Sequence, residues 1–96
     1  MSNIDEDEGL YERADDFINL ANSLVEKSTS TKVSASLLFA ASRFNAFIVA
    51  SMTENTEELK NDKNEALEYF SDQYKKMFLS NLEDYIENYD EYFQSE

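Results

Sequence analysis

Residues 56–93 decide the fold of this chain, and they read TEELKNDKNEALEYFSDQYKKMFLSNLEDYIENYDEYF. Apolar and aromatic residues recur there every three or four positions, which is the period of an amphipathic α-helix. The stretch contains no Gly and no Pro, so no residue in it forces a helix to end. Asn55 and Glu58 have the spacing of a capping box, which favours a helix start near Thr56. We therefore expect one long helix over about 56–93.

Two more helices are expected before this one. Residues 8–27 place their apolar side chains on one helical stripe, and Asp5 with Glu8 has capping-box spacing. Residues 32–52 are apolar on almost every side, which predicts the central helix of the fold, covered on more than one face. The hydroxyl of Ser30 or Thr31 is the expected N-terminal cap of that helix.

The composition supports an all-α class. A chain of 96 residues forms one domain, and one Gly with no Pro leaves too few turn residues for a sandwich or an α/β fold. We expect an antiparallel helical bundle of three long helices over about 8–27, 32–52 and 56–93. The single domain then covers 1–96, with acidic, frayed ends at about 1–7 and 94–96.

The third helix is too long for its neighbours. A rise of 1.5 Å per residue gives about 57 Å for this helix and about 30 Å for each of the others. Its second half either overhangs and packs against another copy of the chain, or breaks near Ser80 to give a fourth helix, since Ser80 and Glu83 have capping-box spacing. The overhang is favoured and predicts a homodimer. The candidate interface residues are Phe78, Leu82, Tyr85, Ile86, Tyr89 and Phe93.

Arg43 is the only charged residue between Lys32 and Glu54. A buried guanidinium needs an acidic partner, because an unpaired buried charge is very costly. In an antiparallel pair of helices that turns near residues 28–31, Arg43 lies level with Asp16. Asp15 and Glu12 are within reach as well. This structural ion pair is the favoured interpretation, and the alternative is a site for a small anionic ligand centred on Arg43.

The residue types present argue against an enzyme. The chain has no His and no Cys, so the commonest general base, the commonest transition-metal ligand and the thiol nucleophile are all absent. The acidic start does not match the pattern of an EF-hand calcium loop. We expect no catalytic residues, no metal site and no cofactor.

Charge is concentrated at the two ends of the chain. Of the net charge of −13, residues 1–16 carry −6, residues 17–76 carry −1, and residues 77–96 carry −6. Such a chain is not expected to bind nucleic acid or an anionic membrane. The apolar stretch 33–52 is interrupted by Arg43, which argues against a membrane span. With no pattern of a signal peptide at the start, the expected location is the cytoplasm.

Several sequence blocks together resemble a known family. They are Glu12-Arg13-Ala14-Asp15, the run from Val33 to Ala41, Arg43-Phe44-Asn45-Ala46-Phe47, Tyr69-Phe70, and Asp84-Tyr85-Ile86. The pattern is similar to a family of small, all-helical, uncharacterised proteins of proteobacteria, a domain of unknown function. The resemblance covers about residues 10–90. It implies a bacterial, helical protein and assigns no activity to any residue.

The expected function is that of a small helical interaction or structural module without catalysis. It is expected to self-associate through the aromatic C-terminal half of the third helix, since Tyr and Phe favour protein interfaces. One alternative is an acidic regulator or mimic that binds a basic protein partner. The other is a small anionic-ligand binder centred on Arg43.

Overall fold

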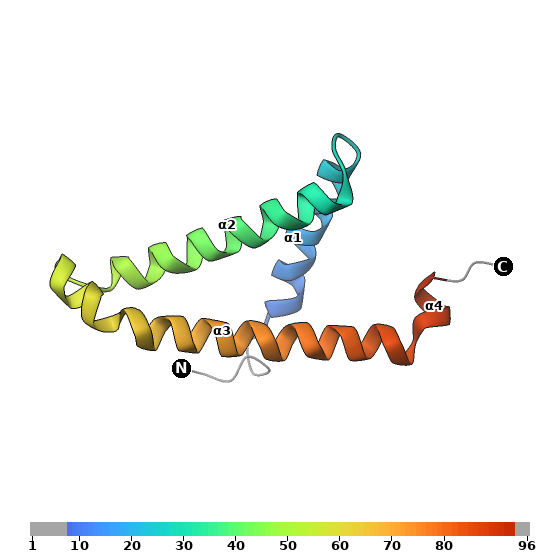
Figure 1. Cartoon of the computed structure of the whole chain (residues 1–96). Helices are drawn as coiled ribbons and strands as arrows, with labels where there is room; N and C mark the ends of the chain where they lie inside the picture. The colour runs from blue at the N-terminus through green and yellow to red at the C-terminus, as the bar shows by residue number, and fades with distance from the viewer. Residues whose placement is uncertain (1–7, 94–96) are drawn as a thin grey trace. The chain divides into compact units, whose positions relative to one another are not determined.

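The computed structural model describes residues 8–93, and every regular element in that range is a helix. The elements are α1 (Leu10–Val25), α2 (Ser30–Ser51), α3 (Thr56–Glu87) and the short α4 (Tyr89–Phe93). Figure 1 shows the four helices in chain order. The all-α class is therefore confirmed, and the first two helices begin and end within two residues of their predicted limits.

Helix α1 begins at the only glycine of the chain. Gly9 is the N-cap, with a φ of 85°, and no side chain caps this end. That left-handed conformation is strained for residues with a Cβ atom, which explains why glycine occupies the position. The predicted cap, Asp5, lies outside the described residues. Glu8 is described but lies before Gly9 in a turn, so the helix starts at Leu10, two residues later than expected.

Helix α2 is capped by Thr29, one residue before the two predicted candidates. The Thr29 hydroxyl accepts a hydrogen bond from the Lys32 amide at 3.2 Å, and the Val33 amide donates to the Thr29 carbonyl at 3.0 Å. Ser30 is already helical, so the prediction of Ser30 or Thr31 as cap is wrong. Any of the hydroxyl residues in this connection has the chemistry of a cap, and only the local backbone decides which one faces the free amides.

Helix α3 runs without interruption through Ser80, so the predicted alternative of a break near that residue is wrong. A Ser-x-x-Glu spacing does not end a helix whose backbone hydrogen bonds continue through it. The chain changes direction later, at Asn88, and α4 follows, so the prediction of one helix over about 56–93 is wrong for its last turns. With 32 residues, α3 is about 48 Å long.

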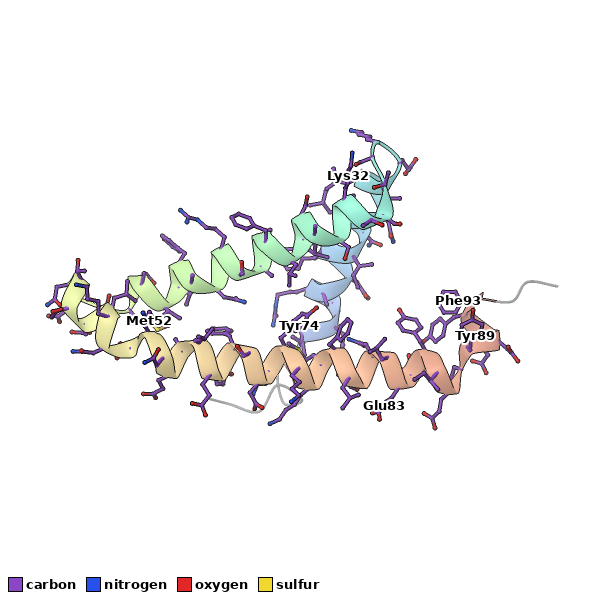
Figure 2. All side chains as sticks on the ribbon, in the orientation of Figure 1. Lys32, Met52, Tyr74, Glu83, Tyr89 and Phe93 are labelled. Carbon is purple, nitrogen blue, oxygen red and sulfur yellow. The ribbon has the colours of Figure 1, made fainter. Side chains whose placement is uncertain are left out.

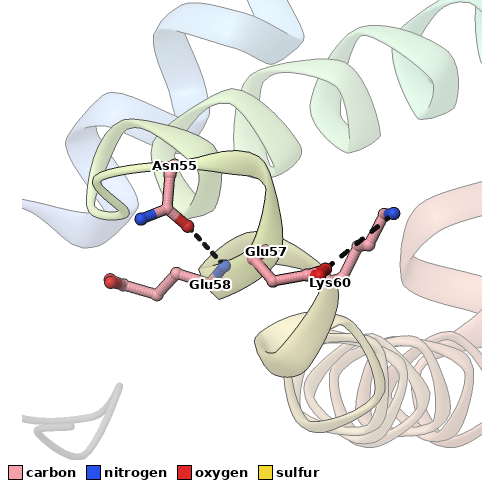
Figure 3. A network of polar contacts seen from close by, with 4 residues as sticks. All are labelled: Asn55, Glu57, Glu58 and Lys60. Atoms are coloured by element: carbon pink, nitrogen blue, oxygen red, sulfur yellow. Dashed lines mark hydrogen bonds and ion pairs between the residues drawn. The ribbon is translucent and has the colours of Figure 1, made fainter.

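The start of α3 has the predicted cap. Asn55 is extended, and its side-chain oxygen accepts a hydrogen bond from the Glu58 amide at 2.9 Å (Figure 3). Glu57 and Glu58 in the first turn complement the positive end of the helix dipole. The Glu57–Lys60 ion pair at 3.9 Å is exposed on both sides and adds little.

Replacing Asn55 with alanine is expected to lower the free energy of unfolding by about 1 kcal/mol, because the Glu58 amide loses its acceptor. The measurement is urea unfolding followed by far-ultraviolet circular dichroism. Asn55→Asp is the matched control, since aspartate keeps a side-chain acceptor at the same position. Equal losses of stability in the two variants would contradict the capping role.

The chain divides into two compact units, Met1–Ile48 and Val49–Glu96. The first unit contains α1 and most of α2, and the second contains α3 and α4. Among residues 8–93, Val33 is the only buried residue, with 8% of its surface exposed. It lies in the first turns of α2, so buried apolar surface in the first unit centres on the turn between α1 and α2. The large apolar residues of α2, among them Leu38, Phe39 and Phe44, are exposed.

Candidate interaction surface

The six side chains predicted as an interface are all exposed. Their exposed fractions range from 43% for Tyr85 to 73% for Ile86. They lie on the second half of α3 and on the residues that follow it to the end of α4. We call them the C-terminal aromatic surface, which consists of Phe78, Leu82, Tyr85, Ile86, Tyr89 and Phe93.

Helix geometry places the first residues of this surface on one side of α3. At 100° per residue, Phe78, Leu82 and Tyr85 point within about 60° of one another around the helix axis. The surface continues N-terminally, because the Tyr74 ring stacks on the Phe78 ring with centroids 5.6 Å apart and planes 14° apart. Figure 2 shows Glu83 on the opposite side of α3 from Tyr89 and Phe93. The apolar side is thus separate from a charged side.

Helix α4 turns away from α3 at Asn88, and we call the junction of the last turn of α3 with α4 the corner. Part of the C-terminal aromatic surface packs together there. The Tyr85 ring lies edge-on to the Tyr92 ring, with centroids 4.7 Å apart, and 5.7 Å from the Phe93 ring. The Tyr89 and Phe93 rings are 5.0 Å apart. Aromatic pairs at these distances attract one another beyond the burial of their area. The four rings therefore hold α4 against the last turn of α3, while their outer faces remain exposed.

Polar contacts fix the same corner. The Asn88 amide nitrogen Nδ2 donates to the Asp84 carboxylate at 2.9 Å and to the Asp84 carbonyl at 3.2 Å. The backbone amide of Asn88 donates to the same carbonyl at 3.0 Å. Asn88 ends α3 with φ −117° and ψ 29°, outside the helical range. Its carbonyl then accepts from the amides of Glu91 and Tyr92, which starts α4.

Tyr92 closes the corner with a hydrogen bond back to α3. Its hydroxyl donates to the second Asp84 carboxylate oxygen at 2.8 Å. Two effects of this carboxylate raise the pKa of the Tyr92 phenol above the ordinary value of 10.0. The larger is the hydrogen bond that the phenol donates, and the second is the negative charge of the carboxylate. The neutral phenol is the donor, so the folded corner favours the protonated form.

The contribution of Tyr92 to corner stability is expected to depend on pH. Because the pKa is higher in the folded state, the contribution is complete below pH 10.0 and is lost as pH rises through the raised pKa. The measurement is the absorbance of phenolate near 295 nm during alkaline titration, as a difference between the wild type and Tyr92→Phe. Asp84→Asn is the control that removes the negative charge, and it is expected to move the Tyr92 titration back toward 10.0. A Tyr92 titration that Asp84→Asn leaves unchanged would contradict this assignment.

The corner is acidic. The last turn of α3 carries no base, and it carries Asp84 and Glu87 at the negative end of the helix dipole. A shallow surface hollow at the corner is lined by residues 86–91, which include Glu87, Asp90 and Glu91. Three carboxylates around one hollow do not favour an anionic ligand there. Among residues 8–93, no three acidic side chains are grouped closely enough to hold a metal ion.

Arg43 is exposed rather than buried. Among residues 8–93, no ion pair joins its guanidinium to Glu12, Asp15 or Asp16. An exposed guanidinium is hydrated and needs no acidic partner, so the reason for expecting the pair does not hold in the structure. Within α3, the Lys76 amine lies 3.1 Å from the Asp72 carboxylate.

By length and composition alone, α2 is the one helix of the described chain that would be able to cross a membrane. Arg43 lies near the middle of α2, where a charge costs about 3 kcal/mol in a lipid environment.

A family model described as "Protein of unknown function (DUF3144)" matches residues 10–86. The chain belongs to the DUF3144 family. The match covers α1, α2 and all of α3 but its last residue, and it ends before Asn88 and α4. The predicted membership of a family of unknown function is confirmed. The corner that Asn88 and Tyr92 hold lies largely beyond the region that the family model describes.

A solved structure supports the helical fold of this DUF3144 chain. The NMR structure of the protein NB7890A from Shewanella sp is similar to it, with 37% sequence identity and a TM-score of 0.75. The similarity covers 91% of this chain and 93% of that one. Among curated proteins, none matches the chain.

Sequence reasoning missed three residues of the corner, namely Asp84, Asn88 and Tyr92. The spacing of Asp84 and Asn88 is that of an i,i+4 pair, which also occurs inside uninterrupted helices. The bond between Tyr92 and Asp84 spans eight residues and depends on the turn at Asn88. Without the turn, no local pattern connects the two side chains.

Proposed function

We propose that this DUF3144 chain is a helical interaction module without catalysis that self-associates through the C-terminal aromatic surface. The supporting observation is the exposure of all six of its side chains, including three aromatic rings held in fixed contact at the corner. Contiguous exposed apolar patches mark sites of association, and Tyr and Phe are enriched there.

The length of α3 favours a second copy of the chain as the occupant. Helix α3 is about 48 Å long, whereas α2 with 22 residues reaches about 33 Å and α1 with 16 residues about 24 Å. A single face as long as α3 is matched by a helix of the same length, and a second α3 provides one. A self-complementary patch is also the usual basis of a symmetric dimer.

The absence of His and Cys supports a role without catalysis, and the acidic ends support a partner that is a protein rather than a nucleic acid or an anionic membrane.

The carboxylates of Glu87, Asp90 and Glu91 around the corner favour one second candidate, a basic protein partner bound at the same place. Such binding is expected to weaken steeply with salt. A cytoplasmic location is part of the same proposal.

The deciding experiment is the absolute mass of the wild-type chain, measured by light scattering after size exclusion from micromolar to millimolar concentrations. Self-association predicts a rise from the 11.1 kDa of one chain to twice that mass. A mass that stays at one chain throughout this range would overturn self-association and leave the basic partner as the candidate to test.

A further inference from the structure

We infer that two copies pair antiparallel through α3, centred on Leu82, with Lys75 and Lys76 of each copy facing the acidic corner of the other. This inference rests on the proposed self-association and adds its orientation, its register and a role for two lysines.

Charge is distributed unevenly along α3. All of its bases lie in the part up to Lys76, and no base follows Lys76 anywhere in the sequence. Five acids follow it within the described chain, at Glu83, Asp84, Glu87, Asp90 and Glu91. A parallel pair in register places each of these acids level with its own copy, and like charges at close range repel. The charge distribution therefore disfavours a parallel pair.

An antiparallel pair centred on Leu82 brings apolar residues level with apolar residues. Leu82 meets itself, Phe78 lies level with Ile86, and Leu79 lies level with Tyr85. All five side chains are exposed, with exposed fractions between 43% and 73%. The pairing would thus cover every residue of the surface within α3 and also Leu79, which sequence reasoning did not include.

The same register brings opposite charges together. Lys76 of one copy lies level with Asn88 of the other, where α3 ends next to Glu87, and Lys75 lies level with the start of α4. Lys75 points about 20° from Leu82 around the α3 axis and so lies on the apolar side itself, whereas Lys76 lies on its flank, about 120° from Leu82.

Lys76 has a partner within its own chain, Asp72 at 3.1 Å, and both side chains are more than half exposed. An exposed pair of this kind is held weakly, so Lys76 can exchange Asp72 for a carboxylate of the second copy at low cost.

Cysteine cross-linking tests the orientation, because the chain has no native Cys. Phe78→Cys and Ile86→Cys chains are mixed in equal amounts and oxidised mildly, and the cross-linked dimers are resolved by intact mass. The antiparallel pair predicts that the mixed dimer of the two variants dominates over both homodimers. Tyr11→Cys, exposed on α1, gives the background from random collisions. Before oxidation, circular dichroism and light scattering establish that each variant is folded and still associates.

The outcomes separate the two proposals. Homodimers of Phe78→Cys and of Ile86→Cys, with little mixed product, would overturn the antiparallel register while a wild-type dimer keeps self-association intact. A wild-type monomer with cross-links no stronger than the Tyr11→Cys background would overturn both.

A charge-reversal pair tests the lysines and leaves the six residues of the C-terminal aromatic surface unchanged. Lys75→Glu with Lys76→Glu is expected to weaken the dimer about tenfold, through lost attraction and new repulsion. Lys60→Glu with Lys63→Glu changes the net charge equally but lies far from the centre of the pair, and it is expected to have a much smaller effect. Equal weakening by the two double variants would overturn the role of Lys75 and Lys76.

Discussion

A chain carrying Tyr85→Glu and Tyr89→Glu is expected to be a folded monomer at concentrations where the wild type is a dimer. The two substitutions place carboxylates within the C-terminal aromatic surface, and both positions are about half exposed in the single chain. Exposed carboxylates are tolerated by one copy, but a second copy would have to desolvate them beside its own. We expect association to weaken at least about a hundredfold, measured by light scattering across a dilution series.

The matched control for this variant is Tyr11→Glu with Met52→Glu. Both residues are exposed, at 72% and 76%, and both lie outside the surface, so the control adds the same two charges elsewhere. It is expected to retain the wild-type mass, which separates a local effect from general repulsion between acidic chains. Loss of association in both variants would argue that net charge, and not this surface, controls the oligomeric state.

Val33→Asp is expected to lower the free energy of unfolding by about 3 kcal/mol. Val33 is the only buried residue among residues 8–93, and a carboxylate at its place loses hydration without a partner. A domain of this size has a total stability of about 5 to 10 kcal/mol, so this one change removes a large share of it. Urea unfolding followed by circular dichroism gives the number.

Two variants separate the causes of that loss. Val33→Ala removes apolar volume without adding charge and is expected to cost about 1 to 2 kcal/mol. Ser34→Asp adds the same charge to the neighbouring exposed position of the same helix, and is expected to change stability by less than about 0.5 kcal/mol. If Val33→Asp and Ser34→Asp unfold at the same urea concentration, the burial of Val33 does not make the expected contribution to the free energy of unfolding.

The helices were largely predictable from the sequence because their signals are local. The period of apolar residues located α1 and α2 to within two residues, and the Asn55–Glu58 spacing located the start of α3 at Thr56. The lack of Gly and Pro correctly favoured a continuous helix through Ser80. Each of these signals depends on residues within one or two turns of one another.

The corner and the state of Arg43 were not predictable in the same way. The turn at Asn88 depends on Asp84, Tyr85 and Tyr92 acting together, and their contacts exist only once the chain has turned. An apolar helix suggests a buried arginine, but the pattern does not state which side of the helix is covered. In the structure the guanidinium is exposed. All six residues of the predicted interface are exposed, and their role in association stays a prediction.

The acids of α3 make its two ends unequal in a way that bears on how the helix opens. Glu57 and Glu58 reinforce the N-terminal turn, whereas Asp84 and Glu87 stand beside carbonyl groups that already carry partial negative charge. Within the hydrogen-bonded part of α3, backbone amides are therefore expected to exchange with solvent fastest near residue 87, with protection increasing turn by turn toward Leu59, whose amide bonds the Asn55 carbonyl. Positive charge brought to the corner would slow that exchange. Binding of a partner to the surface would therefore be measurable as slower amide exchange in the last turns of α3.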